Sequence, residues 1–314
     1  MSTNPQVLIA GAGPVGMTLA NELVRHGVSV RIVDKSAART DKSKALVLWS
    51  RSLELFDDAG YAADFAASGM QAHGAQISTG KEIVARVSLD TIDSRFPYAL
   101  MIAQSETERV LEEKLAARGV RVERTVELTG FQDDGSRVSA TLRRADGTTE
   151  TVTAGWLAGC DGAHSTVRHT LGMAFEGSTM QSDWVLADGH IAGIEPKDRI
   201  HIYWHRDGIL AFFPIVGDRF RVIADLGEAP GDGHGEGHRA DPTVAEVQAL
   251  LERRGSPGMK FANPVWLASF RINERKVKDY RHGRVFLAGD DREQLRLCRA
   301  GGGLRSQASD VRDS

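Results

Sequence analysis

The sequence predicts an α/β fold, in which a Rossmann-like nucleotide-binding domain carries an inserted, mostly antiparallel β-sheet domain. Three observations lead to this fold class. Residues 6–34 contain an apolar run, a glycine-rich turn, a helical pattern and a second apolar run, which is the order of a βαβ unit. Residues 183–227 alternate apolar and polar side chains, as antiparallel strands do. The dipeptides DG at 161–162 and GD at 289–290 each follow an apolar run, where ligands meet the strand ends of an α/β sheet.

The composition is that of an ordinary globular protein. The 314 residues are 41% hydrophobic and 26% charged, and they are enough for two domains. A net charge of −3 argues against binding to nucleic acid, which requires many cationic side chains. Cys160 and Cys298 are far apart in the sequence, which favours a reducing compartment without a disulfide framework or a zinc site. No basic leader precedes the first apolar run, and the run 209–216 is too short to span a bilayer, so we expect a cytoplasmic protein that does not bind membranes.

The first strand is expected at residues 7–10 and leads into the pattern Gly11-x-Gly13-x-x-Gly16. In a nucleotide-binding turn the first glycine permits the tight turn, the second lets the backbone approach a pyrophosphate, and the third lets helix and strand pack closely. The N–H groups at the helix start carry partial positive charge toward the phosphates. The residues expected around the pyrophosphate are Gly11, Ala12, Gly13, Pro14, Val15 and Gly16.

A helix is expected after this turn, because Val15, Leu19 and Leu23 recur at a spacing of four residues and share one face. Gly27 stands where such a helix ends. The second apolar run ends in Asp34, whose carboxylate can accept hydrogen bonds from ribose hydroxyls and would repel a 2′-phosphate. The unit therefore favours FAD or NAD over NADP. The alternative is an ordinary βαβ unit with a chance glycine turn.

Two further helices are expected before the β-rich middle of the chain. The apolar pattern of residues 45–60 predicts the first. The second is expected to begin at Gln104-Ser105, because Ser105 and Glu108 have the spacing of a capping box, and to end at Gly119.

The middle of the chain is expected to be rich in strands. The sequence Ala-Asp-Gly at 145–147 predicts the turn of a hairpin between residues 138–144 and 149–157. The alternating pattern of residues 183–227 then predicts a mostly antiparallel sheet, and residues 243–253 have a helical pattern. We expect this division: nucleotide-binding segments 1–70, 101–175 and 281–290, β-sheet segments 71–100 and 176–280, and an atypical, disordered tail 291–314.

Three motifs now stand in order: GxGxxG from Gly11, CDG at 160–162, and RVFLAGD at 284–290. Together they resemble the class A FAD-dependent aromatic hydroxylases of the para-hydroxybenzoate hydroxylase type, particularly those that act on phenols and polyketides. The resemblance covers about residues 5–290 and includes FPI at 213–215. It implies a monooxygenase that uses FAD, NAD(P)H and O₂ to hydroxylate a small aromatic substrate through a flavin hydroperoxide. It also implies no side-chain nucleophile, no second Rossmann unit, and a monomer or homodimer.

The resemblance assigns roles to individual residues. The turn glycines would hold the pyrophosphate and Asp34 the adenosine ribose. The other implied cofactor contacts are Lys35, Lys44, Arg51, Gln104, Leu128, Asp161, Gly162, Arg168, Gly289 and Asp290. The candidates for a substrate face are Trp204, Phe212, Phe213 and Pro214, although ordinary sheet core is an equal expectation for the aromatic residues.

Two other signals have a simpler interpretation. The pattern His234-x-Glu236-x-His238 has metal-ligand spacing but stands among glycines, so a solvated loop is expected. His164 lies inside the DG stretch, where a structural role is expected.

After Asp290 the resemblance stops. The family continues with Ala-Ala-His, a Pro-Gly-Gly turn and a long helix, so we expect a truncated or out-of-frame ending here. Two alternatives to the monooxygenase therefore stay open: a flavin oxidoreductase that does not oxygenate, and an inactive FAD-binding remnant.

Overall fold

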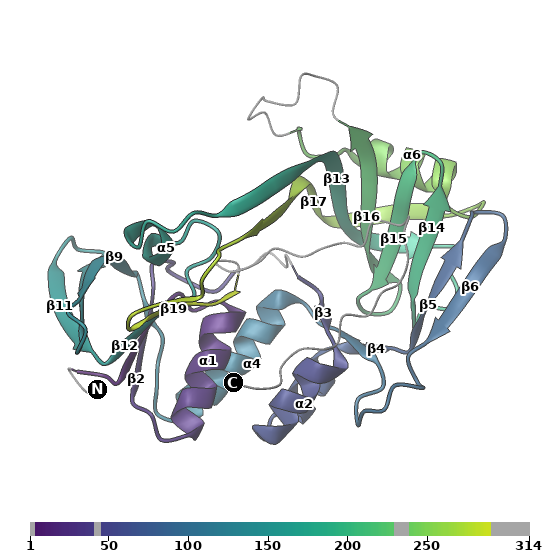
Figure 1. The fold of residues 1–314 in the computed structure, drawn as a ribbon. Coiled ribbons are helices and arrows are strands. Elements are labelled where there is room, and N and C mark those ends of the chain that lie inside the picture. The colour runs from purple at the N-terminus through teal and green to yellow at the C-terminus, as the bar shows by residue number, and fades with distance from the viewer. Residues whose placement is uncertain (1–3, 41–44, 229–238, 290–314) are drawn as a thin grey trace.

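The computed structural model describes residues 4–40, 45–228 and 239–289, and these form two halves joined by a pair of long strands (Figure 1). One half contains a six-stranded sheet and the other a seven-stranded sheet. The joining strands are β13 (Glu176–Ala192) and β17 (Lys260–Lys276), which pair with each other antiparallel. The α/β fold class with an antiparallel sheet is confirmed.

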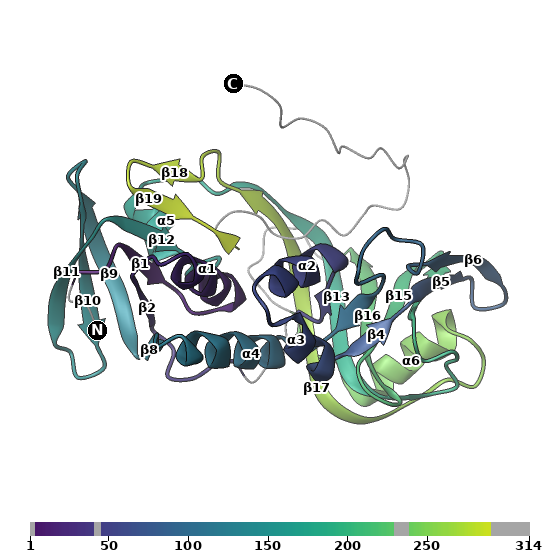
Figure 2. The same cartoon turned by 90° about the horizontal axis from the view of Figure 1, so that it is seen from below.

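The six-stranded sheet has the order β18-β19-β12-β1-β2-β8 and is parallel except at its β18 edge. Its strands are β1 (Val7–Ala10), β2 (Val30–Asp34), β8 (Glu123–Arg124), β12 (Trp156–Gly159), β18 (Arg281–His282) and β19 (Val285–Leu287). Helices α1 (Pro14–Arg25) and α4 (Gln104–Ala117) lie side by side along it (Figure 2). The three-stranded sheet of β9 (Val126–Asp133), β10 (Val138–Arg144) and β11 (Thr149–Ala154) packs on its other face. All four β1 residues are apolar and buried, because both faces of a parallel sheet are covered.

Helix α1 begins directly after the glycine turn. Gly13 is its N-cap and Pro14 its first residue, a position where the missing N–H of proline costs no hydrogen bond. Gly27 follows its end with φ +76°, as expected for a residue after a helix.

Of the three α1 residues expected to share a face, Leu19 and Leu23 pack against the core, whereas Val15 is 42% exposed. Met17 is fully buried. Val15 therefore lies on an exposed side of the first turn, whereas Gly16 and Met17 of the same turn are already buried.

The predicted capping box at the start of α4 is also wrong. Ala103 is the N-cap, no side chain caps this end, and Ser105 already lies inside the helix. Glu108 is buried and binds elsewhere. A complete capping box is found instead in α6 (Val244–Arg254), between Thr243 and Glu246.

The predicted hairpin at 145–147 is confirmed, since β10 and β11 pair antiparallel across it. The predicted second strand, 149–157, is divided in two, however. Residues 149–154 stay in the hairpin, and Trp156 begins β12 of the parallel sheet. Gly155 lies at the junction, where an added Cβ would be 2.9 Å from the Gln6 carbonyl oxygen.

The seven-stranded sheet has the order β17-β13-β16-β15-β14-β5-β6, and all neighbours are antiparallel except β14 and β5. Its further strands are β5 (Gly74–Ser78), β6 (Ile83–Ser88), β14 (Ile200–His205), β15 (Gly208–Pro214) and β16 (Arg219–Glu228). One face packs against α6 around Phe212, Phe220 and Val247. The mostly antiparallel sheet expected from the alternating pattern is confirmed.

The remaining elements are β3 (Val47–Leu48), α2 (Ser50–Asp58), α3 (Ala62–Ser68), β4 (Met70–Ala72), β7 (Ala99–Met101) and α5 (Thr166–Thr170). The first five lie toward the seven-stranded half, and α5 packs against β9 and β12. Strands β3, β7 and β4 form a small antiparallel sheet. The part of the chain that the structure describes contains no helix long and apolar enough to cross a membrane. The described residues also contain no group of three potential metal ligands, and the His234 pattern lies outside them.

Candidate functional site

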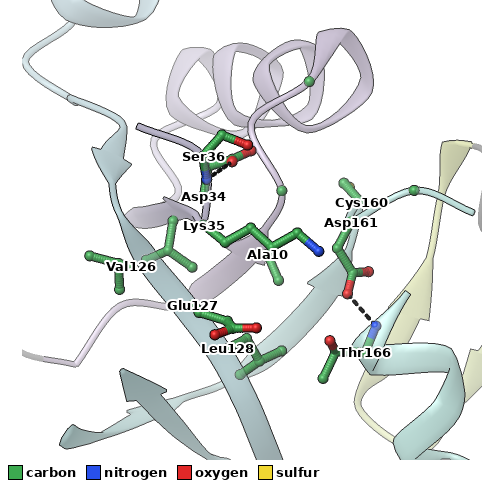
Figure 3. Close-up of a pocket in the computed structure, with 14 residues that line it drawn as sticks. Ala10, Asp34, Lys35, Ser36, Val126, Glu127, Leu128, Cys160, Asp161 and Thr166 are labelled. Atoms are coloured by element: carbon green, nitrogen blue, oxygen red, sulfur yellow. Dashed lines mark hydrogen bonds between the residues drawn. The ribbon is translucent and has the colours of Figure 1, made fainter. Parts of the chain in front are cut away.

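A cavity of ≈ 320 Å³ opens at the carboxyl ends of β1, β2 and β12 (Figure 3). This is the position at which open α/β sheets bind their ligands. Its walls come from segments far apart in the sequence. The lining residues are Ala10, Gly11, Gly13, Val33, Asp34, Lys35, Ser36, Val126, Glu127, Leu128, Cys160, Asp161, Gly162 and Thr166.

The three glycines of the turn have different surroundings. Gly11 has φ +101°, and an added Cβ would be 2.2 Å from the Cys160 carbonyl oxygen. A Cβ on Gly16 would be 2.0 Å from the Gly11 carbonyl oxygen. Among the described residues, a Cβ on Gly13 would meet nothing within 4 Å. Gly11 and Gly16 are therefore required by packing inside the protein, whereas Gly13 leaves open space beside the N-terminus of α1.

The Asp34 carboxylate is fixed by backbone groups on both sides. The Ala12 N–H donates to Oδ2 at 2.7 Å, and the Ser36 N–H donates to Oδ1 at 2.8 Å. A carboxylate has about four acceptor positions, so two such bonds leave capacity for hydroxyl donors. The Lys35 and Glu127 side chains extend into the same cavity (Figure 3).

Asp161 forms the opposite wall and stabilises the start of α5. Its Oδ1 accepts from the Ser165 hydroxyl at 2.6 Å, and its Oδ2 accepts from the N–H groups of Thr166 at 2.7 Å and Val167 at 3.3 Å. Gly162 follows with φ +81° and open space around its Cα. The DG pair therefore fixes the cavity wall through its own backbone and through α5.

Several expected cofactor contacts do not line this cavity. Arg168 is 4% exposed, and its guanidinium lies 4.4 Å from the centre of the Phe175 ring. Arg51 forms an exposed ion pair with Glu54 at 3.0 Å. Gly289 lies beside Val15, because a Cβ added to Gly289 would be 3.1 Å from the Val15 side chain.

The other expected contacts have separate positions. The Gln104 carboxamide binds Ala45 and Glu108. Ala12, Pro14 and Gly16 belong to the glycine turn without lining the cavity. Lys44 and Asp290 lie outside the described residues.

Seven cavity residues were not among the expected cofactor contacts: Ala10, Val33, Ser36, Val126, Glu127, Cys160 and Thr166. Ser36 and Thr166 are close to expected residues in the chain and are found by extending each motif by a few positions. Glu127 had no local signal. It reaches the site because β9 packs beside β2, which only the tertiary structure shows.

The candidate substrate residues divide between the two faces of the seven-stranded sheet. Phe212 is fully buried on the α6 side, where its ring is 5.6 Å from that of Tyr203 in an edge-on arrangement. Pro214 pairs with Phe220 on this same side. Phe213 and Trp204 lie on the other face, since neighbouring strand residues point to opposite faces. Phe212 is ordinary sheet core, which was an equal expectation for the aromatic candidates.

A buried ion pair lies on the same face as Phe213. Arg221 donates from Nε to Asp188 Oδ1 at 2.8 Å and from Nη2 to Oδ2 at 2.7 Å. The two residues are 3% and 5% exposed, and the guanidinium lies 5.6 Å from the centre of the Trp266 ring. This face therefore combines apolar side chains with one fixed polar group.

The site defines a dinucleotide-binding protein of the Rossmann-like class. Residues 4–292 match the family described as "FAD binding domain". The chain therefore belongs to this family.

Two of the matched relatives are monooxygenases by name. The chain is 37% identical over 293 residues to 6-methylpretetramide 4-monooxygenase of Streptomyces rimosus, covering 91% of this chain and 50% of that protein. It is 32% identical over 294 residues to pentachlorophenol 4-monooxygenase of Sphingobium chlorophenolicum, covering 92% and 53%. The chain thus spans about half the length of these curated relatives.

Solved structures show the same fold. Anhydrotetracycline hydroxylase from Streptomyces rimosus has a TM-score of 0.69 and 29% identity, with 93% of this chain and 57% of that chain covered. The p-nitrophenol 4-monooxygenase from Pseudomonas putida DLL-E4 has a TM-score of 0.78 and 23% identity, with 94% and 75% covered. At this lower identity the likeness shows the fold alone.

Proposed function

We propose that this chain binds FAD as part of a FAD- and NAD(P)H-dependent monooxygenase that hydroxylates a phenol-like or polyketide-like aromatic substrate. The observation that carries the proposal is the open side of Gly13 at the N-terminus of α1, in one cavity with Asp34 and Asp161. The names of the relatives support the reaction class, since they include a pretetramide and a pentachlorophenol monooxygenase.

The residues of the cavity suit the nucleotide part of FAD. Gly13 and the first N–H groups of α1 would meet the pyrophosphate, where partial positive charge favours an anion. Asp34, already fixed by two N–H donors, would accept from the adenosine ribose. The Lys35 ammonium would offset the phosphate charge, and Glu127 would disfavour a 2′-phosphate.

Bound FAD would supply the redox chemistry that activates O₂, which no side chain provides. The protein would position the flavin and the substrate and exclude water between its two halves. The apolar face around Phe213 and Trp204 would meet the aromatic ring of the substrate. Lys44, Arg51, Gln104, Leu128, Gly162, Gly289 and Asp290 remain proposed cofactor contacts. Arg168 would act only by supporting the DG wall, because it is buried against Phe175.

The division into domains at the boundaries given above, the use of NAD(P)H, a cytoplasmic location and a monomeric or homodimeric state belong to the same proposal. The two sheets and the paired strands β13 and β17 support such a division.

The first experiment is a visible absorption spectrum of purified protein after incubation with FAD and removal of the excess. We expect the bands of bound oxidised flavin, then NAD(P)H oxidation stimulated by a phenol, with O₂ uptake matched by hydroxylated product. Colourless protein would contradict the proposed cofactor. NAD(P)H oxidation without hydroxylated product would instead favour a flavin oxidoreductase that does not oxygenate.

A further inference from the structure

Glu108 is a buried carboxylate without a cationic partner among the described residues. It is 4% exposed, and no described lysine, arginine or histidine forms an ion pair with it. Burial of a charge without a counter-ion is costly unless several hydrogen bonds stabilise it. The hydrogen bonds of Glu108 therefore indicate why a carboxylate stands at this position.

Both carboxylate oxygens accept from N–H donors. Oε1 accepts from Gln104 Nε2 at 2.9 Å, one helical turn earlier on α4. Oε2 accepts from the backbone N–H of Thr40 at 3.2 Å. A carboxylate satisfies both donors, whereas a glutamine here would present one acceptor and one donor.

The network continues from Gln104 to Ala45. The Ala45 N–H donates to Gln104 Oε1 at 3.2 Å, and the Gln104 N–H donates to the Ala45 carbonyl oxygen at 3.2 Å. The Ile102 N–H donates to the Leu46 carbonyl oxygen at 2.7 Å, which is a second backbone bond between these two segments. Gln104 is thus held by its side chain and its backbone at once.

The network connects the start of α4 with the segment that follows Asp34. Thr40 is six residues after Asp34 in the sequence, and Arg39 forms an ion pair with Glu112 one turn further along α4, at 3.3 Å. Glu112 forms none of the three side-chain hydrogen bonds that join Glu108, Gln104, Thr40 and Ala45.

We propose that Glu108 is a positioning residue of the nucleotide site. It holds the Gln104 carboxamide in one orientation together with the backbone at Thr40 and Ala45, and so determines how Gln104 meets the bound FAD. This role rests on the proposed function for its link to FAD, whereas the coupling between Glu108 and Gln104 does not.

The network allows a test by exchange of side chains. Glu108→Gln places an amide N–H against one of the two donors, and Gln104→Glu places two carboxylates together. The double variant Gln104→Glu/Glu108→Gln restores all three donor–acceptor pairs. In it the new amide at position 108 can accept from the Thr40 N–H and donate to the new carboxylate at position 104, which accepts from the Ala45 N–H. Glu112→Gln is the matched control on the same helix.

FAD affinity and amide hydrogen exchange at Thr40 and Ala45 are measured for each variant. We expect each single change to weaken FAD binding about tenfold or more and to abolish protection of at least one of the two amides. The exchanged double variant should recover the protection of both amides and bind FAD more tightly than Gln104→Glu alone. Glu112→Gln should leave FAD affinity within about twofold of wild type.

The two readouts separate the positioning role from the proposed function. Wild-type protein that takes up no FAD would contradict the proposed function, while the amide exchange of the same proteins still shows whether residues 104 and 108 are coupled. Loss of protection in the double variant equal to the sum of the single changes would overturn the proposed network. Unchanged FAD affinity in Glu108→Gln, with FAD bound to wild type, would overturn the positioning role.

Discussion

The two halves of the molecule position their functional groups by different means. In the nucleotide-binding half the cavity is built largely from backbone: two glycines that allow close contact, one that leaves open space, and a carboxylate held by N–H groups. In the seven-stranded half the decisive property is the face on which a side chain lies, as Phe212 and Phe213 show. Backbone requirements leave a pattern of residue types in the sequence. The assignment of faces depends on how strands pair.

The largest expected effect comes from breaking the buried ion pair in the seven-stranded half. Arg221→Met would leave Asp188 buried without its counter-ion, so we expect the free energy of unfolding to fall by about 3–5 kcal/mol. Chemical denaturation measures this loss. Replacing both partners, in Asp188→Leu/Arg221→Met, should recover most of it.

Arg25→Met is the matched control, because Arg25 pairs with Glu22 on the surface of α1, where solvent screens an ion pair, and should leave stability nearly unchanged. Equal losses for Arg221→Met and Arg25→Met would show that the Asp188 pair has no special role in the sheet.

Two substitutions in the glycine turn test the role of the backbone in the nucleotide-binding half. Gly11→Ala forces a Cβ to within 2.2 Å of the Cys160 carbonyl oxygen at a positive φ, and we expect a loss of about 2–4 kcal/mol in stability. The new methyl group in Gly13→Ala meets no atom of the residues that the structure describes, so stability should change by less than about 0.5 kcal/mol while FAD affinity falls roughly tenfold. Denaturation and flavin titration measure the two effects. Normal FAD affinity in Gly13→Ala would contradict the proposed pyrophosphate position.

His201 provides a pH test of the seven-stranded half. Burial lowers the pKa of His201, the hydrogen bond to the Pro196 carbonyl oxygen opposes this, and Arg199 lowers the pKa further. As the pH falls through about 6.5, His201 therefore binds a proton in the unfolded chain before it does so in the folded chain. Stability is complete above that pH and decreases below it, until the lowered pKa of the folded state is reached, by up to about 1.4 kcal/mol for each pH unit.

His201→Gln keeps an N–H donor for Pro196 but does not titrate. We expect a smaller loss of stability between about pH 7 and pH 5 in this variant than in wild type. Thermal or urea unfolding across this pH range measures the difference. Parallel pH profiles of the two proteins would show that His201 does not contribute.

The smallest effect concerns the helix starts of the two halves. Thr243→Ala removes a capping box from α6 and should cost about 1 kcal/mol. Ser105→Ala lies inside the first turn of α4, where no side chain caps the helix, and should change stability by less than about 0.5 kcal/mol. A loss of about 1 kcal/mol in Ser105→Ala would instead support the capping box that the sequence predicted.

Local patterns predicted the elements whose geometry is decided by neighbouring residues. The glycine turn, the hairpin at 145–147 and the end of α1 before Gly27 are of this kind. The position of Asp34 at the end of β2 also followed from the sequence, although its role toward a ribose stays a prediction. The predicted capping box failed because spacing alone does not fix where a helix begins. Ser105 and Glu108 have the right spacing, but the true start of α4 places Ser105 inside the helix.

The sequence by itself determined the glycine turn and the βαβ order around it, because glycines, an acidic residue and apolar runs at fixed spacing are direct consequences of one backbone path. Only the tertiary structure decided that Glu127 enters the cavity from β9, that Phe212 faces α6, and that Asp188 meets Arg221 across two strands. These contacts join residues that are distant in the chain. Their side chains carry no local signal of the partner, since the pairing of strands and the packing of sheets determine which face each residue occupies.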